Sequence, residues 1–246
     1  MSRFPPLLPA DPLAPFPPPA TALAHPNGLL AVGGDLSVPR LLNAYRSGIF
    51  PWYADDQPVL WWSPDPRVVF RSEGVHLSRR FKRQLRGLDW RVRADHRFGQ
   101  VIRACAGAPR PGQRGTWITD DMILAYERLH RAGHAHSVEV MAGDRLVGGL
   151  YGVSVGRMFF GESMFSAVSG ASKVALAALG WRLSRWGWPV FDAQVGNPHL
   201  LRMGAEAWPR DRFLGVLARQ VLQPGMPGSW QAAFGGIEAG ALAADG

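Results

Sequence analysis

The chain has 246 residues, of which 47% are hydrophobic and 19% charged, the composition of a folded globular protein with a sizeable core. Its formal net charge is +8, and Lys82 and Lys173 are the only lysines among the 27 basic residues. Arginine and the ten tryptophans suit phosphates and stacked bases, but a GC-rich genome also enriches arginine. Composition alone leaves both interpretations open.

Three classes of protein are excluded by simple sequence features. Cys105 is the only cysteine, which excludes a disulfide framework and a zinc site built on cysteines. The chain has no window of about 18 apolar residues that could span a membrane. Residues 1–19 lack the apolar core of a secretory signal. We therefore expect a protein of the reducing cytoplasm.

Differences in composition along the chain divide it into an arm, two domains and a tail. Residues 1–19 contain eight prolines, which exclude a regular helix and predict an extended arm that can lie on the body. Residues 20–65 are dense in turn signals and hold one expected helix, at 38–47, so they should form a small domain that packs on the rest. Residues 225–246 are rich in glycine and alanine after Trp230, which predicts a frayed tail.

Residues 66–224 carry a mixed pattern of helix and strand. Helices are expected at 76–85, 98–106, 120–132, 172–186, 198–203 and 210–222, and strands at 135–141, 145–153, 157–162 and 189–195. An antiparallel meander followed by a helix and another strand is the order of the latter part of an acetyltransferase-like domain. The predicted fold is α/β (α+β), with a small N-terminal domain packed on an acetyltransferase-like (GNAT-like) C-terminal domain.

The last predicted strand carries two polar residues, Asp192 and Gln194. Because side chains alternate along a strand, both should face the same side. A carboxylate and a carboxamide on a strand that is otherwise apolar need partners if they are buried. They belong either to a functional site or to a structural hydrogen-bonded pair, and the strand alone does not decide between the two.

Glu162 ends another predicted apolar strand and begins a small polar loop, so it is either a site residue or an ordinary strand exit. The histidines His130, His134 and His136 do not share a helical face, and the glycines within 28–34 lack the lysine of a phosphate-binding loop. We therefore expect no metal ion and no cofactor. The lack of a glycine-rich loop for a pyrophosphate also disfavours coenzyme A.

A run of cations lies on the helix expected at 76–85. Arg79, Arg80, Lys82 and Arg83 have no acidic residue among them to form pairs within the helix. Such an unneutralised cluster favours phosphate contacts, and the alternative is the solvated face of an amphipathic helix.

Four tryptophans lie in or beside turn-rich segments, namely Trp52, Trp61, Trp62 and Trp117. Tryptophans in loops often fill a core. They are also the natural platforms for an unstacked base, so the sequence leaves both roles open.

Eight segments occur in a fixed order, at 26–36, 48–52, 60–67, 115–118, 133–139, 146–152, 161–166 and 192–194. Together they resemble the leucyl/phenylalanyl-tRNA–protein transferases of bacteria. The resemblance implies a cytoplasmic aminoacyltransferase that moves Leu, Phe and, less readily, Met from aminoacyl-tRNA to the α-amine of proteins with an N-terminal Arg or Lys. The new residue marks the protein for degradation. The implied partners are Leu-tRNA, Phe-tRNA and the acceptor proteins, and we expect a monomer that does not bind membranes.

The resemblance also implies roles for individual residues. Gln194 accepts a hydrogen bond from the attacking amine, Asp192 supports it, and Glu162 lies at the catalytic centre. The aminoacyl pocket is formed by Leu150, Phe159, Leu176, Leu179 and Phe191. The 3′-terminal adenosine of the tRNA is held by Trp52 and Trp117, and the tRNA backbone by Arg79, Arg80, Lys82 and Arg83. The sequence departs from the family pattern at Met141, Gly170, Arg202 and Trp208.

Two other functions remain as alternatives. One is an RNA-binding protein with an inert acyltransferase-like domain, against which the presence of Asp192, Gln194 and Glu162 argues. The other is a small-molecule N-acyltransferase that uses coenzyme A, which the missing pyrophosphate loop disfavours.

Overall fold

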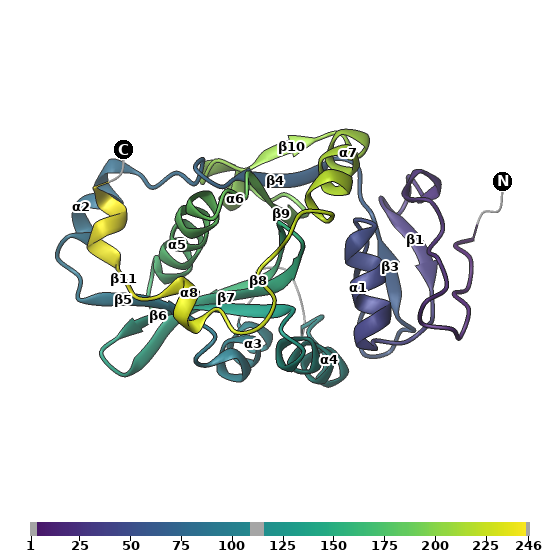
Figure 1. Ribbon diagram of the computed structural model, residues 1–246, viewed down its shortest axis with the longest axis horizontal. Helices are drawn as coiled ribbons and strands as arrows, with labels where there is room; N and C mark the ends of the chain where they lie inside the picture. The colour runs from purple at the N-terminus through teal and green to yellow at the C-terminus, as the bar shows by residue number, and fades with distance from the viewer. Residues whose placement is uncertain (1–3, 109–115, 245–246) are drawn as a thin grey trace.

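The computed structural model describes residues 4–108 and 116–244. Residues 1–3 of the predicted arm, Gly115 of the segment 115–118, and the last two residues of the predicted tail lie outside this range. The chain forms a small N-terminal domain beside a larger domain built on a curled sheet (Figure 1). The prediction of a mixed α/β protein with a small N-terminal domain is confirmed.

The N-terminal domain is a three-stranded antiparallel sheet with one helix. The strands are β1 (Leu29–Val32), β3 (Leu60–Trp62) and β2 (Phe50–Pro51), in that order across the sheet. The helix expected at 38–47 is α1 (Val38–Arg46), and the Ser37 hydroxyl caps it by accepting the Arg40 N–H. A helix with a serine cap carries a clear local signal, whereas strands of two to four residues do not.

The proline-rich arm lies on the N-terminal domain. The Leu8 N–H donates to the Val32 carbonyl at 2.9 Å, which attaches the arm beside β1. The buried Arg40 guanidinium donates to the Pro9 carbonyl at 2.6 Å. The Phe16 ring packs edge-on against Trp61, with ring centroids 5.0 Å apart. The short 3-10 helix η1 (Pro19–Thr21) ends the arm.

The larger domain is built on an eight-stranded sheet. Its strands, in order across the sheet, are β10 (Glu206–Trp208), β4 (Arg67–Arg71), β9 (Val190–Gln194), β8 (Met158–Ser166), β7 (Arg145–Val155), β6 (Ala135–Ala142), β5 (Trp90–Ala94) and β11 (Ile237–Glu238). Neighbouring strands are antiparallel except β8 and β9, which are parallel. The predicted order of meander, helix and strand is confirmed by β6, β7, β8, α5 (Ala171–Arg185) and β9.

Helices cover both faces of this sheet. The curled sheet wraps around α5, whereas α3 (Phe98–Ala106) and α4 (Asp120–Arg131) lie on the other face, with α1 beside them (Figure 1). Each face therefore has its own hydrophobic core. The remaining helices are α2 (Arg79–Leu85), α6 (Pro198–Arg202), α7 (Arg210–Gln220), α8 (Gln231–Phe234) and η2 (Ala239–Ala243).

The expectation of a frayed tail at 225–246 is wrong for the residues that the structure describes. Trp230 and Phe234 are buried, and β11 pairs with β5 as the edge strand of the sheet. The Trp230 N–H donates to Asp95 at 2.7 Å, which attaches the segment to the end of β5. Fraying was expected because most residues of the segment are small. Its few large apolar side chains are buried, however, and their burial stabilises the segment.

Within the described ranges, no helix is both long enough and apolar enough to cross a membrane.

Candidate active site

A cavity of about 470 Å³ lies between the N-terminal domain and the curled sheet. All five residues assigned to the aminoacyl pocket line it, namely Leu150, Phe159, Leu176, Leu179 and Phe191. So do the residues assigned to catalysis and to the terminal adenosine, namely Glu162, Asp192, Gln194, Trp52 and Trp117. Residues more than 100 positions apart in the chain thus meet at one site.

Two β-bulges place the polar residues of this cavity. On β8 the pairing with β7 shifts at Glu162, which becomes an extra residue. On β9 the pairing with β4 shifts between Asp192 and Gln194, which makes Ala193 the extra residue. Bulges interrupt the regular alternation of side chains and redirect them. Glu162 therefore lies inside a strand that continues to Ser166, and the expectation that it ends the strand was wrong.

Asp192 is fully buried and forms an ion pair with Arg67 of β4. Arg67 Nε donates to Asp192 Oδ1 at 2.9 Å, and Arg67 Nη2 donates to Oδ2 at 2.6 Å. This bidentate ion pair is among the strongest hydrogen-bonded interactions that a carboxylate can form. Because Arg67 pairs with both of its oxygens, Asp192 is not a free acidic group in the cavity.

Gln194 adopts a left-handed backbone conformation with φ +59°, which is uncommon for a residue with a side chain. Its main-chain N–H donates to Asp192 Oδ1 at 2.9 Å. Its side-chain Nε2 donates to Glu162 Oε1 at 2.7 Å. Asp192 and Gln194 thus reach the strands on either side of β9, yet both line the same cavity, as expected of residues that face the same side. Asp192 contacts the main chain of Gln194 and leaves the side chain to Glu162.

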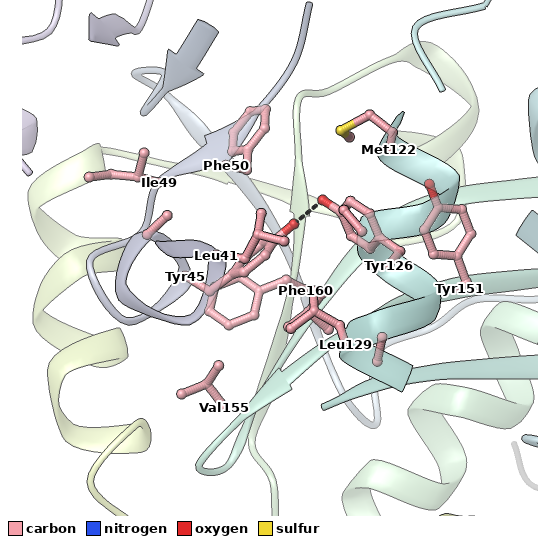
Figure 2. Close-up of a cluster of buried hydrophobic side chains, with 14 of the residues drawn as sticks. Leu41, Tyr45, Ile49, Phe50, Met122, Tyr126, Leu129, Tyr151, Val155 and Phe160 are labelled. Carbon is pink, nitrogen blue, oxygen red and sulfur yellow. Dashed lines mark hydrogen bonds between the residues drawn. The ribbon is translucent and has the colours of Figure 1, made fainter. Parts of the chain in front are cut away.

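Glu162 lies in a ring of hydrogen-bond donors. Tyr45 of α1 donates to Oε1 at 2.8 Å, and Tyr126 of α4 donates to Oε2 at 3.0 Å. The two tyrosine hydroxyl oxygens also lie within hydrogen-bonding distance of each other, and Figure 2 shows them pointing together from the two helices. Burial raises the pKa of Glu162 to about 7, and the nearby Asp192 charge adds to this effect against the donors.

The same tyrosine hydroxyls stay protonated at ordinary pH and can therefore donate hydrogen bonds. Burial and the proximity of Glu162 raise the pKa of both Tyr45 and Tyr126 well above the usual value for a phenol. The α1 helix belongs to the N-terminal domain, whereas α4 belongs to the larger one. The Glu162 carboxyl therefore holds the two domains together as well as facing the cavity.

The tryptophans divide into core and cavity residues. Trp61 is fully buried, and its indole N–H donates to the Gly33 carbonyl at 2.8 Å. Trp52 and Trp117 are only half-buried and line the cavity. The Trp62 indole donates to the Trp52 carbonyl at 2.6 Å, which fixes the backbone beneath the Trp52 ring. The structure thus leaves Trp52 and Trp117 with ring surface that can meet a ligand.

The basic residues lie on α2, at the end of the molecule away from the N-terminal domain (Figure 1). Arg79, Arg80 and Arg83 are exposed, and Lys82 is half-buried. The buried Leu85 anchors the helix to the body. None of the four cations is among the residues that line the 470 Å³ cavity, so they form a separate surface.

A second polar constellation is buried away from the cavity. The His136 ring bonds Asp95 at 2.9 Å and the Ser154 hydroxyl at 3.0 Å, and it stacks on Trp230 with centroids 3.8 Å apart. This order of Ser, His and Asp is that of a nucleophilic triad. His136 is fully buried and is not among the residues lining either described cavity, so a ligand in these cavities does not contact it.

Three residues of the site escaped the sequence analysis, namely Arg67, Tyr45 and Tyr126. Arg67 begins a buried apolar strand, where a charge is costly unless it is paired, and this was a usable signal. Tyr45 and Tyr126 lie on the apolar faces of their helices, where a tyrosine pattern resembles that of ordinary core.

Comparison with known proteins assigns the chain to a family. A family model described as leucyl/phenylalanyl-tRNA protein transferase matches residues 69–218, and the model of its N-terminal domain matches 34–65. A leucyl/phenylalanyl-tRNA–protein transferase of Xanthomonas euvesicatoria pv. vesicatoria is 65% identical over 95% of this chain and 93% of its own length. That of Xylella fastidiosa (strain M12) is 60% identical over 93% of this chain and 94% of its own length.

Among solved structures, L-PGS from Bacillus licheniformis overlaps 68% of this chain and 53% of its own, with a TM-score of 0.38 and 10% identity. The family models and the relatives agree with each other over most of the sequence. The chain belongs to the leucyl/phenylalanyl-tRNA–protein transferase family.

Proposed function

We propose that this protein transfers Leu, Phe and, less readily, Met from aminoacyl-tRNA to the α-amine of proteins that begin with Arg or Lys. It does so as a monomer in the cytoplasm, and the added residue marks the acceptor for degradation. The observation that carries the proposal is the 470 Å³ cavity, in which an apolar wall, two indoles and the pair formed by Glu162 and Gln194 meet.

The reaction is the aminolysis of an ester. The neutral α-amine attacks the carbonyl carbon, a C–N bond forms, and the bond to the ribose 3′-oxygen breaks. The proton lost by the amine ends on that oxygen. The ester is already activated, so positioning supplies much of the acceleration and no covalent enzyme intermediate is needed.

Gln194 orients the amine in this proposal. Its Nε2 is engaged by Glu162, which turns its Oε1 towards the cavity as an acceptor for an N–H of the incoming amine. An amide oxygen is a very weak base, so its contribution is alignment of the nitrogen lone pair and not removal of the proton. The left-handed backbone of Gln194 is the kind of local strain that often accompanies such sites.

Glu162 provides the negative charge for the acceptor. Its pKa of about 7 means that the carboxyl is near the balance between neutral and ionised forms at physiological pH. A cationic Arg or Lys end that enters the cavity favours the ionised form, and the ionised form favours that end in return. Asp192 cannot take this role, since Arg67 already pairs with it.

The apolar wall selects the donor. Leu150, Phe159, Leu176, Leu179 and Phe191 offer no polar atoms, so they distinguish side chains by size and shape. One methylene in such a pocket changes the free energy of binding by only about 1–3 kcal/mol. Large side chains that are unbranched at the β-carbon are therefore accepted as a group, whereas Ile and Val are disfavoured.

The tRNA contacts two surfaces. Trp52 and Trp117 receive the 3′-terminal adenosine by stacking, and the exposed cations Arg79, Arg80 and Arg83, with Lys82, contact phosphates. Phosphate contacts are tolerant of sequence, which suits an enzyme that accepts more than one tRNA.

The deciding experiment mixes the protein with radiolabelled Leu-tRNA or Phe-tRNA and an acceptor protein that begins with Arg. We expect label in an acid-precipitable product that resists ribonuclease. The matched control is the same acceptor with its first residue changed to Asp, which should remain unlabelled. No label in the Arg acceptor would overturn the proposal, and equal label in both would overturn the acceptor specificity.

A further inference from the structure

Arg67 is a fully buried cation whose three nitrogens each donate a hydrogen bond, two to Asp192 and one to Gly48. Nε and Nη2 bind the two oxygens of Asp192, and Nη1 donates to the Gly48 carbonyl at 3.1 Å. The guanidinium carbon lies over the rings of Phe50 and Phe213, 4.7 Å from each ring centroid. Each of the three guanidinium nitrogens thus has a hydrogen-bond acceptor, and two aromatic rings pack against the group.

Such a group is costly to retain for stability alone. An ion pair removed from water loses hydration that its mutual attraction repays only when the geometry is nearly ideal. Apolar residues of similar volume would fill the same space at no such cost. A buried charge that is held this tightly suggests that its geometry serves the site.

The contacts of Asp192 indicate how Arg67 acts on the site. Oδ1 accepts hydrogen bonds from two donors, Arg67 Nε at 2.9 Å and the Gln194 N–H at 2.9 Å. The guanidinium fork sets the rotation of the carboxylate, and the carboxylate then fixes the main chain of Gln194 at the bulge. The position of the Gln194 amide against Glu162 follows from that main-chain conformation.

We propose that Arg67 is a positioning residue, which orients the Gln194 amide through the Asp192 carboxylate and is itself held by the Gly48 carbonyl of the N-terminal domain. The inference rests on the proposed function. Arg67 touches no substrate in this proposal. It makes the docking of the N-terminal domain a condition for correct geometry on β9, since a single guanidinium bonds to both domains.

The test compares Arg67→Lys, Asp192→Asn and the double variant with the unmodified protein. Lysine keeps the charge but loses the planar fork, so Asp192 keeps a cation without the fixed rotation. We expect Arg67→Lys to lower kcat roughly 10²-fold, the scale of a misplacement of about 1 Å. The affinity for aminoacyl-tRNA, measured separately, should change by less than about threefold, because the stacking and phosphate contacts remain.

The double variant tells whether Arg67 acts through Asp192. If it does, the double variant is no slower than the slower single variant, because both changes break the same link. Independent multiplication of the two losses would overturn the proposal. The proposal would also be overturned if the activity lost in Arg67→Lys equalled the fraction of unfolded protein. In that case the variant would regain full activity at a temperature where it is completely folded.

Arg40→Lys is the matched control, because Arg40 is also fully buried, donates to a backbone carbonyl of the arm and pairs with Asp35 at 3.6 Å. It should lose stability yet retain kcat. An equal loss of kcat in Arg40→Lys would reduce Arg67 to a general requirement for folding and overturn the proposal. If the unmodified protein itself transfers no label, the proposed function fails, and the positioning role fails with it.

Discussion

The side-chain amide of Gln194 and the carboxyl of Glu162 are joined by a hydrogen bond of 2.7 Å between neighbouring parallel strands. The same Glu162 oxygen also accepts the Tyr45 hydroxyl. A carboxyl with several donors usually remains ionised, but here its burial outweighs them. The protonation state of one carboxyl therefore affects the domain contact, the amide orientation and the charge of the cavity.

The first prediction concerns the pH dependence of stability. Burial raises the Glu162 pKa from 4.5 to about 7, so between these values the folded state binds more protons than the unfolded state. The free energy of unfolding contributed by this group therefore falls as pH rises through that window and is level above it. Glu162→Gln should remove this fall. The free energy of unfolding of the variant, relative to that of the unmodified protein, should therefore rise by up to roughly 3 kcal/mol from pH 5 to pH 8.

Urea unfolding at the two pH values measures this difference. Glu238→Gln is the control, because it makes the same chemical change on the surface, where Glu238 pairs with Arg91. It should give curves parallel to those of the unmodified protein. Parallel curves for Glu162→Gln as well would contradict the raised pKa.

The second prediction concerns the terminal adenosine. Trp52→Ala should weaken tRNA binding by about 1–3 kcal/mol, which is the value of stacking one base on an aromatic ring. The Trp62 bond to the Trp52 carbonyl does not involve the lost ring, so the local backbone should persist. Equilibrium binding of uncharged tRNA with and without its last adenosine provides the control. The variant should bind both forms alike, and a loss of equal size with the shortened tRNA would assign Trp52 another role.

The third prediction concerns the salt dependence of binding. Arg80→Ala and Arg83→Ala should each reduce the slope of log affinity against log salt by about 1, since each removes one phosphate contact. Arg103→Ala is the control, because this exposed arginine on α3 already pairs with Glu127 at 2.8 Å. Binding titrations at several salt concentrations test the three variants together. An unchanged slope for both Arg80 and Arg83 would place the tRNA elsewhere.

The fourth prediction concerns the C-terminal segment. Trp230→Ala should destabilise the protein by about 3–5 kcal/mol, since it removes a buried indole and leaves a cavity beside His136. Leu222→Ala is the control, because Leu222 is 83% exposed and the change should stay within about 0.5 kcal/mol. Thermal unfolding of both variants makes the comparison. Equal melting temperatures would restore the expectation of a frayed tail.

The sequence predicted best those elements whose signals are local. The helix at α4 carries a threonine cap, acids in its first turn and a glycine stop, and it begins at the expected residue. The strand β4 was missed because its stability comes from β9, more than 100 residues away in the chain. No property of five consecutive residues reveals a partner at that distance.

The candidate site was predicted in its members more than in its geometry. The resemblance supplied Glu162, Asp192 and Gln194, and the cavity brings them together. The sequence did not predict the bulge at Ala193 or the left-handed backbone of Gln194, because both depend on the pairing of β9 with β4. Arg67 lies in the segment 60–67, which contributes to the family resemblance, but the sequence analysis gave it no role. Its partner Asp192 comes beside it only when β4 pairs with β9.

The ring contact between Trp230 and Phe159, with centroids 5.7 Å apart, connects the C-terminal segment to the cavity wall. The chain is made from its N-terminus, so this backing residue emerges from the ribosome after every residue of the site itself. Trp230 follows every residue that lines the cavity, so a chain that stops before it contains the whole lining without this support. The shape of the cavity wall thus depends on a segment that contributes no residue to the cavity.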